Sequence, residues 1–254
     1  MQAAFKSFNI YFDKIWVLTL PRLKDRMNSI RTRLQGLDYE FFYGIDKETL
    51  DYAPMEQLGW YSQKRYQQYY RKPPVMSKGM LSCSLGHLRM YEAIIRNGYK
   101  RTLILEDDAL PVIQYLALFP SVMQSVPEDW EVIYMGYEKN EQFGIAQHLK
   151  RWAYITWPSH AKLKLSRRIY SNYYPRTIST HIARAGFHDC THAYAVTIEG
   201  AKKLLQLQSP VAFNADNLLA YACATKMING YISRPKLFNQ LTAFDGSLPS
   251  LTSD

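Results

Sequence analysis

Residues 103–108, with the sequence LILEDD, constrain the fold more than any other part of this 254-residue chain. Three apolar residues suited to a buried strand lead directly into Glu106, Asp107 and Asp108. Carboxylates are costly to remove from water unless a cation lies beside them. Because α/β proteins bind ligands where their strands end, acids at the exit of a buried strand indicate a site that holds a cation.

Strand geometry predicts which of the three acids act together. Side chains alternate between the two faces of a strand, so Glu106 and Asp108 are expected on one face and Asp107 on the other. Two carboxylates on one face, with room for water and phosphate oxygens, suit Mg²⁺ or Mn²⁺ carrying a nucleotide diphosphate. The alternative is a solvated turn, or acids that cap a helix starting near Pro111.

The rest of the chain alternates between apolar runs and segments of helical period. The expected strands are residues 14–20, 39–43, 101–105, 131–135 and 192–198. The expected helices are residues 23–34, 81–95, 111–123, 200–206 and 214–227, while residues 46–74 read as irregular. This order predicts an α/β fold, a Rossmann-like and mostly parallel sheet with helices on both faces. We expect one domain over residues 1–241, with two small domains as the alternative, and a loose polar tail over 242–254.

The sequence lacks the glycine-rich loops that usually bind phosphate. It contains neither Gly-x-Gly-x-x-Gly nor a Walker loop. The acids and their cation would therefore have to hold the phosphates of a nucleotide.

Four motifs in a fixed order carry a resemblance to a known family. They are residues 15–22 (IWVLTLPR) followed by Asp25-Arg26, residues 81–87 (LSCSLGH), the LEDD strand, and residues 191–196 (THAYAV) with Gly200-Ala201. The chain resembles the glycosyltransferases of family 25, which include lipooligosaccharide galactosyltransferases of bacteria and collagen galactosyltransferases of animals. The resemblance spans roughly residues 14–221.

The resemblance implies an A-type glycosyltransferase fold and an inverting transfer of a sugar from a nucleotide sugar. The donor is expected to be UDP-galactose or a relative, and the acceptor a glycan or glycolipid of the lipooligosaccharide type. Glu106 and Asp108 are then the expected ligands of the cation, Mn²⁺ or Mg²⁺. The expected contacts to the nucleotide sugar are Thr19, Arg22, Arg26, Asp107 and His192.

The reaction needs a general base that takes a proton from the acceptor hydroxyl. Asp216 and Asp189 are the candidates. Asp216 follows Pro210-Val211, where the family often has an acid, although here four residues separate Val211 from Asp216. The alternative role for Asp216 is the N-cap of a helix.

The histidines near these motifs have competing interpretations. His192 could be a third metal ligand, a diphosphate contact or a buried structural residue. His87 is expected to be structural. His188 precedes the late strand and, like Asp189, could face the acceptor.

At three positions the chain departs from the family pattern. Thr19 replaces an Asn, Ser82 a Gly and Gly86 a Ser, while every acid is kept. These departures keep a second class open, a non-catalytic sugar- or lipid-binding relative. A third class, a metal-dependent phosphohydrolase using the same acids, usually needs more His and Asp ligands than this sequence offers.

Positive charge is unevenly distributed along this chain of net charge +9. Residues 142–188 contain no acid, and eight Lys and Arg residues alternate there with aromatics; a second basic and aromatic block spans residues 60–72. Such segments suit an anionic membrane or a phosphorylated glycolipid, with a solvated loop holding some core aromatics as the alternative. No zinc, helix-turn-helix or RNA-recognition motif accompanies the charge, so we expect no nucleic-acid partner.

Cysteine usage and the N-terminal sequence indicate the compartment. Three cysteines without metal-type spacing argue against a disulfide framework and for a reducing compartment. The first residues do not show the order of a signal peptide, and no apolar run approaches the length of a membrane span. The expected location is the cytoplasm, with peripheral contact to the inner face of the membrane.

Overall fold

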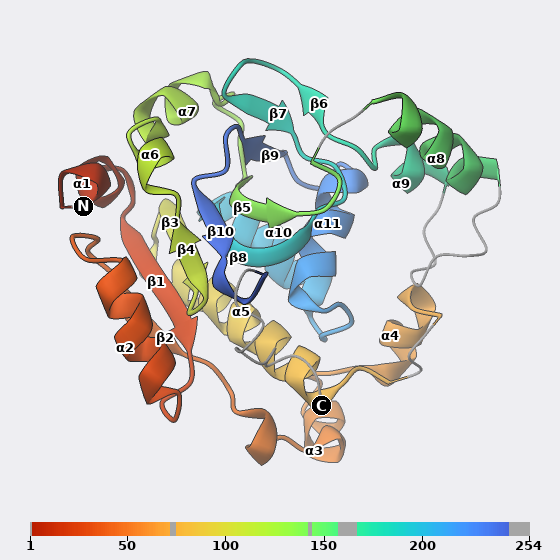
Figure 1. Cartoon of the computed structure of the whole chain (residues 1–254). Helices are drawn as coiled ribbons and strands as arrows, with labels where there is room; N and C mark the ends of the chain where they lie inside the picture. Colours follow the sequence, from red (N-terminus) through yellow and green to blue (C-terminus); the bar gives the residue numbers. More distant parts are fainter. Residues whose placement is uncertain (1, 72–74, 142–143, 157–166, 244–254) are drawn as a thin grey trace.

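The computed structural model describes residues 2–71, 75–141, 144–156 and 167–243. Eight strands form one sheet in the order β2-β1-β3-β8-β5-β9-β7-β6 (Figure 1). The strands are β1 (Lys14–Thr19), β2 (Glu40–Tyr43), β3 (Arg101–Glu106), β5 (Val132–Glu138), β6 (Arg176–Thr177), β7 (Ile182–Arg184), β8 (Asp189–Thr197) and β9 (Gly230–Ser233). A separate antiparallel pair joins β4 (Ala109–Pro111) to β10 (Phe238–Gln240).

Most strands of the sheet run in one direction. β1 pairs in parallel with β2 and β3, and β5 pairs in parallel with β9. β8 lies antiparallel between β3 and β5, so β3 and β5 share a direction. The carboxyl ends of β1, β3 and β5 therefore meet at one edge, which confirms the expected mostly parallel sheet.

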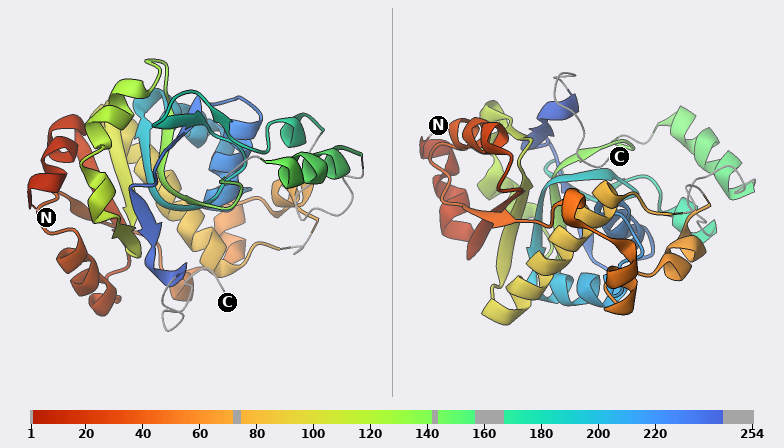
Figure 2. Two further views of the ribbon diagram at one scale, coloured as in Figure 1. Left: turned by 45° about the horizontal axis from the view of Figure 1, so that its top comes forward. Right: turned by 90° about the horizontal axis from the view of Figure 1, so that it is seen from below.

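Helices cover both faces of this sheet, because its central strands are apolar on both sides (Figures 1 and 2). In β3, Ile104 packs into one core while Leu103 and Leu105 pack into the other. The core with Ile104 includes side chains from α5 (Lys78–Asn97), α10 (Ile198–Gln208) and α11 (Ala215–Ala224). The opposite core includes side chains from α1 (Gln2–Tyr11), α2 (Lys24–Arg33), α6 (Ile113–Leu116) and α7 (Phe119–Ser125). No helix in the described ranges is both long and apolar enough to cross a lipid bilayer.

Several segments differ from the sequence-based expectation. The segment expected to be irregular contains η1 (Lys47–Thr49), α3 (Tyr52–Gln57) and α4 (Gln63–Tyr69), because its tyrosines pack into the core. The helix expected over 111–123 starts later because β4 occupies residue 111, and it is divided into α6 and α7 because Pro120 cannot continue a helix and lies in the first turn of α7. The acid-free segment contains α8 (Ile145–Thr156) and α9 (Arg167–Ser171) as well as β6 and β7.

The expected tail begins inside the fold. Thr242 belongs to η3 (Leu241–Ala243), and the backbone N–H of Leu241 donates to the carbonyl of Asp108. The prediction of a loose tail from residue 242 is therefore wrong at its start, and residues 244–254 lie outside the described residues.

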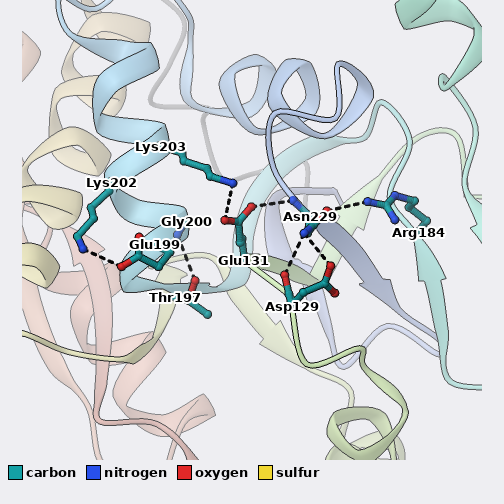
Figure 3. Close-up of polar contacts among 9 residues, drawn as sticks. All are labelled: Asp129, Glu131, Arg184, Thr197, Glu199, Gly200, Lys202, Lys203 and Asn229. Carbon is teal, nitrogen blue, oxygen red and sulfur yellow. Dashed lines mark hydrogen bonds and ion pairs between the residues drawn. The ribbon is translucent and has the colours of Figure 1, made fainter.

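The edge where β5 and β9 begin is held by polar contacts (Figure 3). Glu131 accepts a hydrogen bond of 2.9 Å from the backbone N–H of Asn229 and forms an ion pair of 2.6 Å with Lys203. Thr197 caps α10 by accepting from the backbone N–H of Gly200, while its own N–H donates to the Glu131 carbonyl. These contacts bring the start of α10 directly against the strand entry, at the edge opposite the three acids.

Gly200 is predicted to be essential for this close approach. A Cβ at residue 200 would lie 2.5 Å from the carbonyl oxygen of Glu131, which is backbone and cannot rotate away. Gly200→Ala should therefore lower the free energy of unfolding by about 1–3 kcal/mol in denaturant titrations, as other overpacked substitutions do. Gly144→Ala is the matched control: its Cβ would meet only the flexible end of Gln147, and stability should change by less than about 0.5 kcal/mol. Equal stability of the two variants would contradict this packing.

Candidate active site

A cavity of about 460 Å³ opens at the edge of the sheet where β1 and β3 end. Its size is typical of a small-ligand site, and its place is where α/β proteins bind ligands. Its polar and charged lining residues are Thr19, Arg22, Arg26, Lys47, Ser82, Cys83, Glu106, Asp107, Asp108, Cys190, Thr191, Asp216, Gln240 and Thr242. Seven of the nine residues predicted from the sequence are in this set; Asp189 and His192 are not.

The three consecutive acids do not continue the strand. β3 ends at Glu106, and Asp107 and Asp108 form a turn that leads into β4. The chain turns there because β4 pairs with β10, so strand alternation no longer sets the side-chain directions. The prediction that Asp107 faces away from Glu106 and Asp108 is therefore wrong: all three line the same cavity.

Asp107 is neutralised by contacts within the protein. Thr19 Oγ1 donates to Asp107 Oδ2 at 2.7 Å, and Arg26 Nη1 donates to Oδ1 at 2.8 Å. This pair fixes Arg26 at the cavity wall. Arg22, the other predicted cation, pairs instead with Asp46, and this contact lowers the pKa of the Asp46 carboxyl.

Asp108 keeps one carboxylate oxygen without a partner among the described residues. Its Oδ2 accepts from Gln240 Nε2 at 3.0 Å and from Thr242 Oγ1 at 2.9 Å, while the buried Oδ1 accepts from none of the described residues. Burial, and then the charge of Glu106, raises the pKa of Asp108 to about 6. A buried and unpartnered carboxylate oxygen beside a second carboxylate fits the binding of a cation.

Contacts with His87 and Thr191 stabilise the anionic form of Glu106. Burial alone would raise its pKa, but His87 and the Thr191 hydroxyl act in the opposite direction, and the pKa of Glu106 lies below its usual value. His87 Nε2 lies 3.4 Å from Glu106 Oε1, and its Nδ1 lies 2.8 Å from the hydroxyl oxygen of Tyr194. His87 is buried and oriented by Tyr194, which fits the structural role expected for it.

Thr191 joins Glu106 to Asp216. Its hydroxyl contacts Glu106 Oε1 and lies 3.1 Å from Asp216 Oδ1. One hydroxyl proton serves only one of the two carboxylates at a time, so the second is better accommodated when protonated. Burial and the charge of Glu106 accordingly raise the pKa of Asp216 to about 6. Asp216 is not the N-cap of α11, because Asn214 fills that role by accepting from the N–H of Asn217.

The other predicted residues lie outside the cavity lining. His188 is buried and both of its ring nitrogens meet backbone groups, so the expectation that it could face the acceptor is wrong. His192 is buried against Gly136. A Cβ added to residue 136 would lie 2.1 Å from Nε2 of His192, so the ring packs directly on the glycine. Burial lowers the pKa of His192 to about 4, so the ring is neutral. Asp189 is partly exposed and paired with Lys139.

Some lining residues were not predicted to take part in the site. Thr191 and Cys83 could have been predicted from the sequence. Thr191 lies in the same motif as His192, and Cys83 lies in the same motif as His87. Gln240 and Thr242 follow β9 and carry no motif, and the sequence offered no signal for them. Cys83, His87 and Glu106 also form a group whose ligating atoms lie within 4.8 Å of one another. Thiol and imidazole suit a softer cation than the oxygens of Glu106 and Asp108 do.

Comparison with known proteins identifies the class. The family model of glycosyltransferase family 25 (LPS biosynthesis protein) matches residues 12–219. The chain belongs to this family, and its sheet with helices on both faces is the expected A-type arrangement. Among curated relatives, it is 24% identical over 202 residues to procollagen galactosyltransferase 1 of Danio rerio. It is 22% identical over 199 residues to procollagen galactosyltransferase 2 of Homo sapiens.

The match covers most of this chain but little of these relatives. The two alignments include 78% and 76% of this chain but 29% and 27% of the respective relatives. The chain thus spans less than a third of their length. Similarity extends equally to a relative named as inactive, the inactive glycosyltransferase 25 family member 3 of Homo sapiens, at 24% identity over 78% of this chain and 29% of that protein.

The raised pKa of Asp216 predicts a stability that depends on pH. The unfolded carboxyl ionises near its ordinary value of 3.8, whereas the folded one holds its proton up to about pH 6. The folded state binds more protons in this window, so stability should fall as the pH rises through it. Asp216→Asn removes this cost and should stabilise the cation-free protein by roughly 2–3 kcal/mol at neutral pH and by little near pH 4. Denaturant titrations at the two pH values test this, and a pH-independent difference would contradict it.

Proposed function

We propose that this family 25 chain is an inverting, cation-assisted galactosyltransferase. It moves a sugar from UDP-galactose, or a close relative, to a hydroxyl of a glycan or glycolipid of the lipooligosaccharide type. The single observation that supports this most is the buried oxygen of Asp108 that has no partner among the described residues, held beside Glu106 in a cavity that also contains Asp216. The galactosyltransferase names of the relatives support the choice of sugar.

Glu106 and Asp108 are the proposed ligands for Mn²⁺ or Mg²⁺. Both line the cavity, and each raises the energetic cost of the other's charge, which a divalent cation would relieve. When bound, such a cation supplies Lewis-acid stabilisation of the leaving diphosphate. Gln240 and Thr242 orient Asp108 for this role, and His87 with Thr191 orients Glu106.

Other lining residues are suited to the donor nucleotide. Arg26 is held at the wall by Asp107, which is in turn held by Thr19, so a guanidinium is presented in a fixed place. Arg22 and Lys47 add positive charge to the same cavity. We assign diphosphate and nucleotide contacts to these cations and to Thr19, with Asp107 as their support. His192 is buried behind the lining and would act on the donor only through its neighbours.

Asp216 is the proposed general base. It lines the cavity, and a pKa of about 6 lets it accept a proton from an acceptor hydroxyl near neutral pH and release it afterwards. Asp189 is the second candidate, but it is paired with Lys139 and lies outside the lining. Inversion needs a single displacement at the anomeric carbon, with the base on the acceptor side and the cation on the leaving-group side.

Loss of Asp108 should remove donor binding that depends on the cation. In Asp108→Asn, affinity for UDP-galactose in the presence of Mn²⁺ should fall at least about tenfold in calorimetric titrations, because one charged ligand is lost. Asp38→Asn is the matched control, since Asp38 is exposed and precedes β2 at the opposite edge of the sheet. Mn²⁺-dependent donor binding that survives in Asp108→Asn would remove this cation site from the mechanism.

Asp216→Asn should separate catalysis from binding. The amide is nearly isosteric but does not accept a proton at neutral pH, so turnover should fall by about two to four orders of magnitude while donor affinity is retained. Asp189→Asn, made in parallel, tests the second candidate. A large loss of turnover in Asp189→Asn together with full activity in Asp216→Asn would transfer the role of base to Asp189.

The second function we consider is a non-catalytic member of the family. The similarity to relatives named as inactive favours it, as do the changes at Thr19, Ser82 and Gly86. Release of UDP from UDP-galactose with Mn²⁺, with a panel of galactosyl acceptors, distinguishes the two: a catalytic chain releases UDP and a non-catalytic one only binds the donor. The phosphohydrolase alternative gains no support from the family match.

A further inference from the structure

α8 presents an apolar stripe to solvent. Ile145, Leu149 and Trp152 are 83%, 65% and 61% exposed. Their spacing of four and three residues places all three on one side of the helix. Both views of Figure 2 show α8 (green) at the edge of the molecule, away from the sheet.

The opposite side of α8 attaches it to the protein. The Tyr154 ring stacks on Tyr170 with centroids 5.3 Å apart and meets Tyr173 edge-on. Ile155 packs against the core. The side of α8 with Tyr154 and Ile155 is therefore the one that packs against the protein, and the apolar stripe faces outward.

The charged residues of α8 are all basic. α8 carries Lys150 and Arg151, and no acid occurs from residue 142 to residue 188. An exposed apolar stripe on a helix whose Lys and Arg residues are not offset by any acid is complementary to a bilayer with anionic headgroups, in which such a helix lies flat at the interface.

The other basic and aromatic block has a different role. In residues 60–71, Tyr61, Tyr66 and Tyr70 are buried in the core, and Arg65 donates to the backbone carbonyls of Leu207 and Pro210. Core packing thus explains the buried tyrosines of this block. Its Trp60 is 40% exposed and lies under the guanidinium of Arg89, so among the described residues of the two basic segments the larger exposed apolar surface is the stripe of α8.

We propose that α8 docks the chain on an anionic phospholipid bilayer, with Ile145, Leu149 and Trp152 at the boundary between headgroups and acyl chains. α8 follows β5, and β5 runs parallel to β3, so the helix leaves the sheet at the edge where the cavity opens. Docking would hold the cavity near acceptors that reside in the membrane. The proposal concerns binding to lipid alone and holds or fails independently of the proposed transfer reaction.

Co-sedimentation of the full chain with vesicles tests the proposal. Binding to phosphatidylglycerol–phosphatidylcholine vesicles should exceed binding to phosphatidylcholine alone, and about half-molar salt should weaken it without abolishing it, because the apolar contact is not screened. Leu149→Glu should reduce the partition coefficient at least tenfold. Leu58→Glu is the matched control, since Leu58 is 61% exposed at the end of α3 and should leave binding unchanged.

Two outcomes would overturn the proposal. The first is equal vesicle binding by the Leu149→Glu and Leu58→Glu variants, with circular dichroism showing both folded. The second is absence of vesicle binding together with a dimer in sedimentation velocity that Leu149→Glu dissociates, which would make the stripe a contact between two copies of the chain.

Discussion

The crowding of carboxylates at the end of β3 is the constraint on which the site depends. Four acids, Glu106, Asp107, Asp108 and Asp216, line one partly buried cavity. The fold satisfies two of them internally, Asp107 through Arg26 and Thr19, and Glu106 through His87 and Thr191. The other two are left with raised pKa values. These two carboxylates lower the free energy of unfolding at neutral pH, at the place where the site needs a ligand or a proton. Active sites commonly reduce the stability of a fold in this way.

The parts of the fold predicted from sequence are those with a strong local pattern. The apolar run 103–105 and the helical spacing from Leu81 to Ile95 each correspond to an element of the structure, β3 and α5. The partners of Asp108 could not be predicted in this way. Gln240 and Thr242 lie 132 and 134 residues further along the chain, and only the pairing of β4 with β10 brings them to the turn. Local pattern does not encode such a contact.

The turn after Glu106 explains why strand alternation failed there. The alternation rule holds only while a segment remains in a strand, and three acids in a row give no sign of where the strand ends. The two basic blocks show the same limit at the surface. Both combine cations with aromatics, yet three of the four tyrosines of residues 60–71 are buried whereas Leu149 and Trp152 of α8 are exposed. Composition predicted the chemistry of these segments, but tertiary packing decided which side faces solvent.

The three departures from the family pattern lie on one side of the cavity. Thr19 ends β1 and still donates to Asp107, Ser82 donates to the carbonyl of Ile45, and Gly86 packs against Leu18. Thr19 and Ser82 therefore line the wall formed by β1, α5 and the segment after β2, and Gly86 lies behind this wall against Leu18, while all the carboxylates are kept. Changes confined to this wall would alter the fit of the donor nucleotide before they altered the cation site.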